Sequence, residues 1–199
     1  HHTHTTPRCT TALVHDVRMG AQHACPWAPH PEAPERITAV LDELRAQSLA
    51  QQALRLPARL ASRAEVELCH EVAHWDALEG AVALDAKRMR DWCEAHESLF
   101  LSGRGSLEAA RLACGGVLEL TEAVLGGTVR NGLAIVRPPG HHAGTHRAMG
   151  FCLFNSVAVA AARARQLGAR RVLIVDWDIH QGQGVRYPPA RVIPHQPTQ

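Results

Sequence analysis

The 199-residue sequence lacks the features that mark several special classes of protein. It has no apolar run long enough to span a bilayer and no signal-like start, so we expect no membrane insertion. Its net charge is only +2, from 21 basic and 19 acidic residues, which gives no electrostatic reason to expect direct contact with nucleic acid. With 46% hydrophobic and 20% charged residues, the composition is that of an ordinary globular domain.

Cysteine pairs are also absent. The six cysteines are scattered and form no Cys-x-x-Cys unit, which argues against a zinc ribbon and favours a reducing compartment, the cytoplasm or nucleus. Histidine, by contrast, is abundant, with fourteen residues. Three of these lie in a Thr-rich start, where we predict a disordered leader over residues 1–11 rather than a metal site.

The first half of the chain predicts one short strand followed by helices. Helix signals include a proline at a first turn, a capping box at Ser62–Glu65 and apolar residues at helical spacing. The expected elements are a strand at 12–14, a helix from about Pro34, a short helix after Ser62, an amphipathic segment over 76–95 and a longer helix over 106–125.

The second half predicts a β-α-β unit. Residues 131–136 form a short apolar run, Asn155 can cap an alanine-rich helix that ends near Gly168, and 171–177 is a β-branched run typical of a buried parallel strand. Such a unit implies parallel strands and an α/β fold. The proline-rich residues 188–199 predict an irregular tail.

Metal-seeking side chains follow the last predicted strand. Asp176, Asp178 and His180 are two residues apart, so in a strand all three would point to one face. They would lie at the carboxyl end of the strand, where open α/β sheets bind their ligands. This spacing predicts half of a metal site.

Paired histidines follow the preceding strand. His141 and His142 would lie at the same edge of the sheet, and a metal beside paired imidazoles suits hydrolysis with a histidine as proton shuttle. Asp176 could accept a ring N–H and orient a histidine, while Gly140 could adopt a backbone geometry that other residues resist. Each motif alone fits a surface turn, but the two together favour an active site.

Three ordered motifs in this chain resemble the zinc-dependent histone deacetylase family. They are Arg137-Pro-Pro-Gly-His-His142, Gly150-Phe-Cys-Leu-Phe-Asn155 and the run from Val175 to Gly184, and residues 30–37 are similar to an N-terminal family motif. The residues of these motifs are most similar to those of class IIb, the branch of the tubulin and polyamine deacetylases. The resemblance implies a parallel-sheet arginase/deacetylase-like fold, truncated after the metal-bearing strand, over residues 12–187.

The resemblance also implies roles for individual residues. Asp178 and His180 match two Zn²⁺ ligands, and Asp176 matches the carboxylate behind the first histidine, which in the family also lends oxygens to K⁺. His142 matches the general base and His141 its electrostatic partner. The remaining matches are Gln183 beside the second histidine, Gly150 and Phe151 in the wall of the acyl-lysine tunnel, and Arg36 near an inner cavity.

Departures from the family pattern leave the function of the chain open. The third zinc ligand, a Gly-Gly-Tyr tyrosine and the acidic residue that selects polyamines all belong to later family segments with no match here, and Tyr187 is not an equivalent. The resemblance implies hydrolysis of an acetyl amide in a histone, tubulin or polyamine. The alternative is a catalytically incomplete fragment or splice form that acts, if at all, as a binding module, and for this chain alone we expect inactivity.

Overall fold

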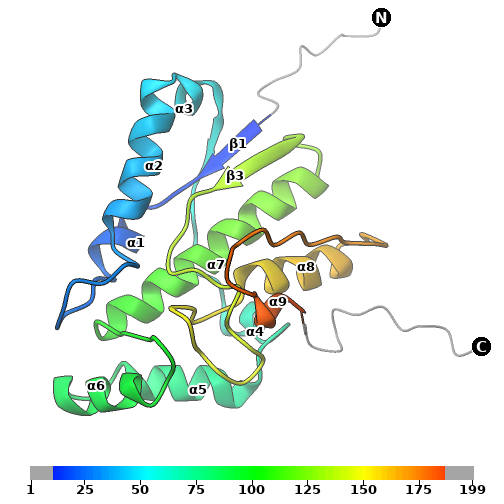
Figure 1. Cartoon of the computed structure of the whole chain (residues 1–199). Helices are drawn as coiled ribbons and strands as arrows, with labels where there is room; N and C mark the ends of the chain where they lie inside the picture. The colour runs from blue at the N-terminus through cyan, green and yellow to red at the C-terminus, as the bar shows by residue number, and fades with distance from the viewer. Residues whose placement is uncertain (1–10, 187–199) are drawn as a thin grey trace, which may run out of the picture.

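The computed structural model describes residues 11–186, which are drawn in colour in Figure 1. Within them, three strands form one parallel sheet in the order β2-β1-β3. Leu13 lies at its centre, with Arg55 and Leu133 as its partners on the two sides. The parallel sheet confirms the predicted α/β class. The strands are β1 (Thr11–Val14), β2 (Leu54–Leu56) and β3 (Asn131–Ala134).

Helices cover both faces of this sheet, with α7 on one face and α2 on the other (Figure 1). Val14 points toward Gly116 of α7, whereas Leu13 shares an apolar pocket with Leu44 of α2. In the described chain the helices are α1 (Arg18–Ala21), α2 (Glu35–Ala46), α3 (Leu49–Gln52), α4 (Arg63–Val66), α5 (Val72–Ala81), α6 (Ala86–Glu94), α7 (Arg104–Leu125), α8 (Ser156–Gln166) and α9 (Gln183–Arg186).

Local capping explains where several helices begin. The predicted capping box is confirmed, because Ser62 and Glu65 satisfy each other's backbone N–H groups at the start of α4. The predicted cap of α8 is confirmed as well, since the Asn155 side chain accepts the Ala158 N–H at 3.0 Å. The expected segment 76–95 is two helices, α5 and α6, because the Asp85 side chain caps a new helix.

The predicted strand over 171–177 is wrong. These residues adopt no regular secondary structure, and the side chains of Leu173 and Trp177 are 86% and 92% exposed. The predicted strand over 131–136 does form, as β3, but it lies at an edge of the described sheet and most of it is exposed. A strand requires a neighbour for its hydrogen bonds, and 171–177 has none among the described residues.

The loss of that strand also removes the premise that Asp176, Asp178 and His180 share one face. Asp176 contacts His141, while Asp178 and His180 contact each other. The second strand of the predicted β-α-β unit is therefore missing from the described structure, although its helix, α8, packs firmly along α7.

Two expected properties can be compared with the described residues. None of their helices is long and apolar enough to cross a membrane. The cysteines in this part of the chain are free, namely Cys25, Cys69, Cys93, Cys114 and Cys152. The expected tail and all but the last residue of the expected leader lie outside 11–186, where Thr11 already belongs to β1.

Candidate active site

A buried arginine fixes the start of the loop that carries the histidine pair. Arg137 and Glu32 have side chains only 2% exposed, and their ion pair is bidentate, with N···O distances of 2.8 and 2.6 Å. Arg137 also donates to the backbone oxygens of Met19 and His23. No role was predicted for Arg137. Its guanidinium links the segment after β3 to the segments that carry Met19, His23 and Glu32.

Gly140 in this loop is needed for close packing rather than for an unusual φ angle. A Cβ atom at this position would approach the carbonyl oxygen of Phe154 to 2.7 Å and the nitrogen of Ser156 to 2.9 Å. Its φ angle is not positive, so the predicted reason for this glycine is wrong. The absence of a side chain lets the loop pack against the start of α8.

The two histidines each have a separate side-chain partner. Nδ1 of His141 lies 3.0 Å from Oδ2 of Asp176, and Nδ1 of His142 lies 2.8 Å from Oε1 of Gln183. The ring centroids of the pair are 4.0 Å apart. These are the contacts that the resemblance implies, and they form although 171–177 is not a strand.

The contacts of Gln183 favour one tautomer of the His142 ring. The Gln183 amide NH₂ faces the Met149 sulfur at 3.2 Å, which leaves the amide oxygen toward the imidazole. An oxygen accepts, so Nδ1 of His142 donates and Nε2 keeps its lone pair in the neutral ring. The arrangement prepares Nε2 to accept a proton.

Cys152 and Gly150 pack directly against His142. The backbone N–H of His142 points at the Cys152 sulfur, 3.4 Å away, and burial raises the pKa of this thiol to about 12. Gly150 has a φ of +54°, and a Cβ there would come within 2.5 Å of the His142 ring. Gly150 therefore restricts the position of the imidazole, whereas Cys152 contacts the His142 backbone. Cys152 had no predicted role.

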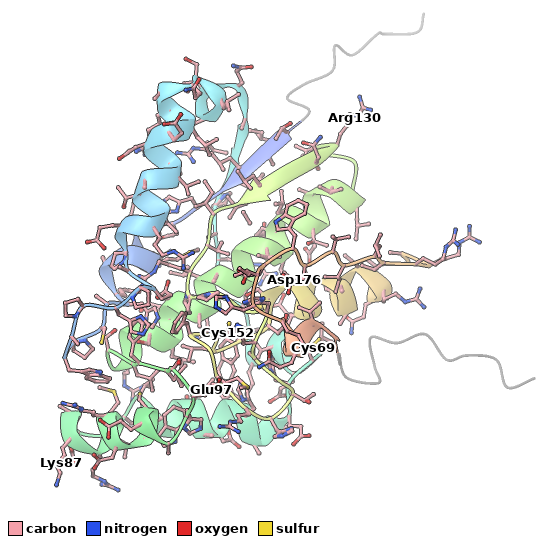
Figure 2. The ribbon with its side chains drawn as sticks, viewed as in Figure 1. Cys69, Lys87, Glu97, Arg130, Cys152 and Asp176 are labelled. Carbon is pink, nitrogen blue, oxygen red and sulfur yellow. The ribbon has the colours of Figure 1, made fainter. Side chains whose placement is uncertain are left out.

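A pocket of about 320 Å³ opens beside His142. In the view of Figure 2, Cys152 lies between Asp176 and Glu97. The pocket brings together five of the predicted site residues, namely His142, Gly150, Phe151, His180 and Gln183. It is lined by Glu97, Ser98, His142, Met149, Gly150, Phe151, His180, Gln181 and Gln183.

Phe151 is held in this wall by its backbone and its ring. Its φ is +68°, its N–H donates to the Ser98 carbonyl at 3.1 Å, and its ring meets His30 edge-on at 4.7 Å. Glu97 and Ser98 were not predicted as site residues. They precede α7 in a part of the sequence that resembles the family only loosely, so no motif signalled them.

Asp178 and His180 form an exposed pair of donors. Nδ1 of His180 lies 3.0 Å from Oδ1 of Asp178, and the side chains are 75% and 47% exposed, respectively. Hydrogen bonds from the backbone and side chain of His180 lower the pKa of Asp178. Both groups could bind one ion, because donors on a tetrahedral zinc lie roughly 3.3 Å apart.

These two donors do not complete a zinc site. Among residues 11–186, no group of three or more His, Cys, Asp or Glu side chains could hold a metal. Catalytic zinc in proteins has three protein ligands and an open position. The described residues thus supply fewer ligands than zinc requires.

Arg36 lies apart from this pocket. It lines a second cavity, of about 450 Å³, together with Ile37 and Val40 of α2, residues of β3 and the loop after it, and the Glu32–Arg137 pair. His142 and His180 do not line that cavity. The structure therefore does not bring Arg36 to the histidine pair.

The fold is α/β with a parallel sheet, and two neighbouring histidines, each with its own side-chain partner, lie at a pocket or next to it. This arrangement is that of a hydrolase-like site. Residues 30–188 match the histone deacetylase domain family, which covers most of the chain. The protein therefore belongs to the histone deacetylase family.

Curated relatives and a solved structure agree with this assignment. The chain is 45% identical to polyamine deacetylase HDAC10 of Homo sapiens over 157 residues, 78% of this chain and 23% of that protein. It is 39% identical to histone deacetylase 15 of Arabidopsis thaliana, over 89% of this chain and 31% of the relative. The crystal structure of the HDA15 HD domain matches with a TM-score of 0.75 and 38% identity, over 89% of this chain and 49% of that one.

The chain thus spans about a quarter to a third of these curated relatives and about half of the solved domain. The relatives are named for two substrate classes, polyamines and histones.

Proposed function

We propose that this chain carries the proton-transfer part of a deacetylase site that hydrolyses acetyl amides, in acetylated lysine of a histone or tubulin or in an acetylated polyamine. The contact between His142 and Gln183, at 2.8 Å beside the pocket, is the observation that carries this proposal. It supports the tautomer in which Nδ1 of His142 donates to Gln183 and Nε2 faces a bound water. We further propose that the protein acts in the cytoplasm or nucleus.

In the proposed reaction, a water molecule attacks the acetyl carbonyl while Nε2 of His142 accepts its proton. The same imidazole then donates that proton to the amine nitrogen, the C–N bond breaks, and acetate and a free amine are released. Asp176 accepts the Nδ1–H of His141 and so orients that ring toward the reacting centre. A histidine at this position serves as both base and acid.

Asp178 and His180 are proposed as two ligands of Zn²⁺, which when bound activates water in such sites. Their facing donor atoms, 3.0 Å apart, support this proposal, and the further protein ligand must come from outside the described residues. A K⁺ ion at Asp176 remains a prediction of the resemblance. The incomplete ligand set within residues 11–186 also supports the alternative, a catalytically incomplete fragment that acts, if at all, as a binding module.

A fusion that supplies further ligands would test the proposal. Residues 1–184 would be fused to the later half of the human polyamine deacetylase domain, and release of acetate from an acetyl-lysine peptide and an acetylated diamine would be measured. We expect turnover by the fusion, and a loss of about 10²- to 10⁴-fold with His142→Ala.

His146→Ala is the matched control for this experiment, because His146 lies in the same loop, is exposed and does not line the pocket. It should keep the rate. A folded fusion that is equally fast with His142→Ala would show that another group is the base, and a folded, zinc-loaded fusion without turnover of either substrate would refute the proposed function.

A further inference from the structure

The backbone at Gly184 makes direct contact with the loop that carries the histidine pair. Its N–H donates to the carbonyl oxygen of His141 at 3.0 Å. Gly184 is buried, and a Cβ atom there would overlap the carbonyl oxygen of Ala143 and approach Nδ2 of Asn155 to 2.8 Å. Its φ angle is not in the left-handed region, so this glycine provides room for the close approach of two backbones.

Gly182 has the same need for room, but the atom in its way belongs to a side chain. A Cβ atom there would overlap Oδ2 of Asp176 and lie 3.0 Å from Nδ1 of His141. These are the two atoms that meet at 3.0 Å in the candidate site. A carboxylate can turn to another rotamer, whereas a backbone carbonyl cannot move without the chain around it. An added methyl group at residue 182 should therefore move the carboxylate away from the imidazole and leave the fold intact.

Asp176 also shapes the segment that leads to the glycines. Its Oδ1 accepts the N–H of Asp178 at 3.2 Å, and Oδ1 of Asp178 accepts the N–H of His180 at 2.8 Å. Bonds of this kind between a side chain and the backbone two residues later form local turns, which compete with sheet pairing. One carboxylate therefore contacts His141 with one oxygen and the backbone of the proposed metal ligands with the other.

We infer that Gly182 is a positioning residue for the proton-transfer site, because its lack of a side chain leaves the space in which Asp176 reaches His141. Gly184 sets the distance between the two backbones, and Gly182 keeps the space beside the imidazole open. The inference rests on the proposed function for the role of the histidine pair, and it adds to it the residue on which the contact between Asp176 and His141 depends.

The effect of filling this space should be confined to one of the two histidines. His142 contacts Gln183 at 2.8 Å, and Asp176 takes no part in that contact. A general disturbance of the fold would change both contacts, whereas the loss of the Asp176 carboxylate changes only the one at His141. The two rings of one molecule therefore report whether Gly182 acts through Asp176.

A matched control for Gly182→Ala lies in the histidine loop itself. At Gly144, the nearest atom that a Cβ would meet among the described residues is the carbonyl oxygen of Arg147, at an ordinary distance of 3.8 Å. Gly144→Ala therefore adds the same methyl group beside the site without displacing an atom of it. Asp176→Ala and the double variant with Gly182→Ala complete the set, all in the full 199-residue chain.

The measurement is the position of the proton on each histidine ring. Long-range ¹H–¹⁵N NMR spectra at about pH 8.5, where an unperturbed imidazole is neutral, distinguish a protonated Nδ1 from a protonated Nε2. His141→Gln and His142→Gln assign the signals of the two rings. A ring that donates to a carboxylate through Nδ1 keeps its proton there, whereas an unrestrained ring is a mixture of the two tautomers.

We expect His141 to have its proton on Nδ1 in the unaltered chain and in Gly144→Ala. Gly182→Ala should give His141 the tautomer mixture seen in Asp176→Ala, and should leave the His142 signals and the urea midpoint unchanged. The double variant should match Asp176→Ala alone, because two changes that act through one group are not additive.

A His141 ring that keeps its proton on Nδ1 in Gly182→Ala, or a mixture already present in the unaltered chain, would overturn the inference. A further change in the double variant would overturn it as well, and so would unfolding of Gly182→Ala, since the carboxylate should move before the backbone does. None of these measurements requires turnover. A fusion without turnover, together with the expected tautomers, would refute the proposed function alone.

Discussion

Two segments that supply the candidate site differ sharply in how the fold holds them. The loop over 137–155 carries the histidine pair and ends in a buried core, where Leu153 and Phe154 are 0% and 1% exposed. The segment over 170–182 carries the carboxylates, and Leu173 and Trp177 are almost fully exposed there. Apolar content therefore does not distinguish the two segments.

The difference lies in the partners that each segment finds. Phe154 stacks on Trp75 at 5.6 Å, and the N–H of Asn155 donates to a buried ring nitrogen of His70. The 170–182 segment touches the rest of the site chiefly through Asp176, whose carboxylate meets His141. The proposed proton-transfer groups are therefore held by the core, and the proposed metal ligands are held mostly by each other.

The largest expected effect follows from breaking the buried ion pair of the loop. Arg137→Met leaves the Glu32 carboxylate buried without its partner, so the free energy of unfolding should fall by about 3–5 kcal/mol. Arg90→Met removes an exposed i,i+4 pair and should cost about 0.5 kcal/mol or less. Urea denaturation measures both, and similar losses would contradict the contrast between core and surface.

The same substitution in both segments sharpens the comparison. Leu153→Ala creates a cavity in the core and should lower the free energy of unfolding by about 2–5 kcal/mol. Leu173→Ala should change it by no more than about 0.5 kcal/mol, because the side chain is 86% exposed. A loss above 2 kcal/mol for Leu173→Ala in the same urea assay would show that 171–177 is packed after all.

Buried histidines should make the core, and not the exposed segment, sensitive to acid. Burial lowers the pKa of His23 and of His70 to about 3, and it also lowers that of His74. Unfolded histidines titrate near 6.5, so between pH 6.5 and 3 the unfolded chain binds protons that the folded chain does not. Stability should be full above about pH 6.5 and fall by about 1.4 kcal/mol per pH unit for each such histidine.

Urea midpoints between pH 7 and pH 5 measure this dependence before most carboxylates titrate. His70→Gln should reduce the change of the free energy of unfolding with pH by the contribution of one histidine, about 1.4 kcal/mol per pH unit. A free energy of unfolding that is the same at pH 5 and pH 7 would mean that these imidazoles take up protons in the folded chain as they do in the unfolded chain.

The smallest expected effect concerns zinc. With two donors in the described chain, zinc should bind more weakly than about 1 µM, and Asp178→Ala or His180→Ala should weaken binding further. Calorimetry would use a background with His1, His2 and His4 replaced by alanine, so that this group of histidines cannot contribute. Sub-micromolar zinc binding that neither substitution changes would show that zinc binds at another place in the chain.

Local signals in the sequence were enough to predict elements whose stability is local. The cap at Asn155, the capping box at Ser62 and the parallel strand at 131–134 are all present. The partners of His141 and His142 also match the resemblance. Short-range hydrogen bonds and motif spacing carry this information without knowledge of the rest of the fold.

Properties that depend on distant partners could not be predicted in the same way. The run at 171–175 has strand composition, but a strand also needs a neighbouring strand. Likewise, Glu32 and Arg137 are 105 residues apart, and no pattern in the sequence pairs them. Glu97 lies beside the pocket, and its carbonyl accepts the N–H of Gly150 in a distant loop, a contact that no local pattern predicts.

Hydrogen exchange of backbone amides, followed by mass spectrometry on the full chain, tests the central contrast most directly. Peptides from 150–160, which include the start of α8, should exchange slowly, because their amides are bonded inside the core. Peptides from 171–180 should exchange at rates close to those of an unfolded chain. Equal, strong protection of 171–180 would show that the carboxylate segment is built into the sheet, and would contradict the account.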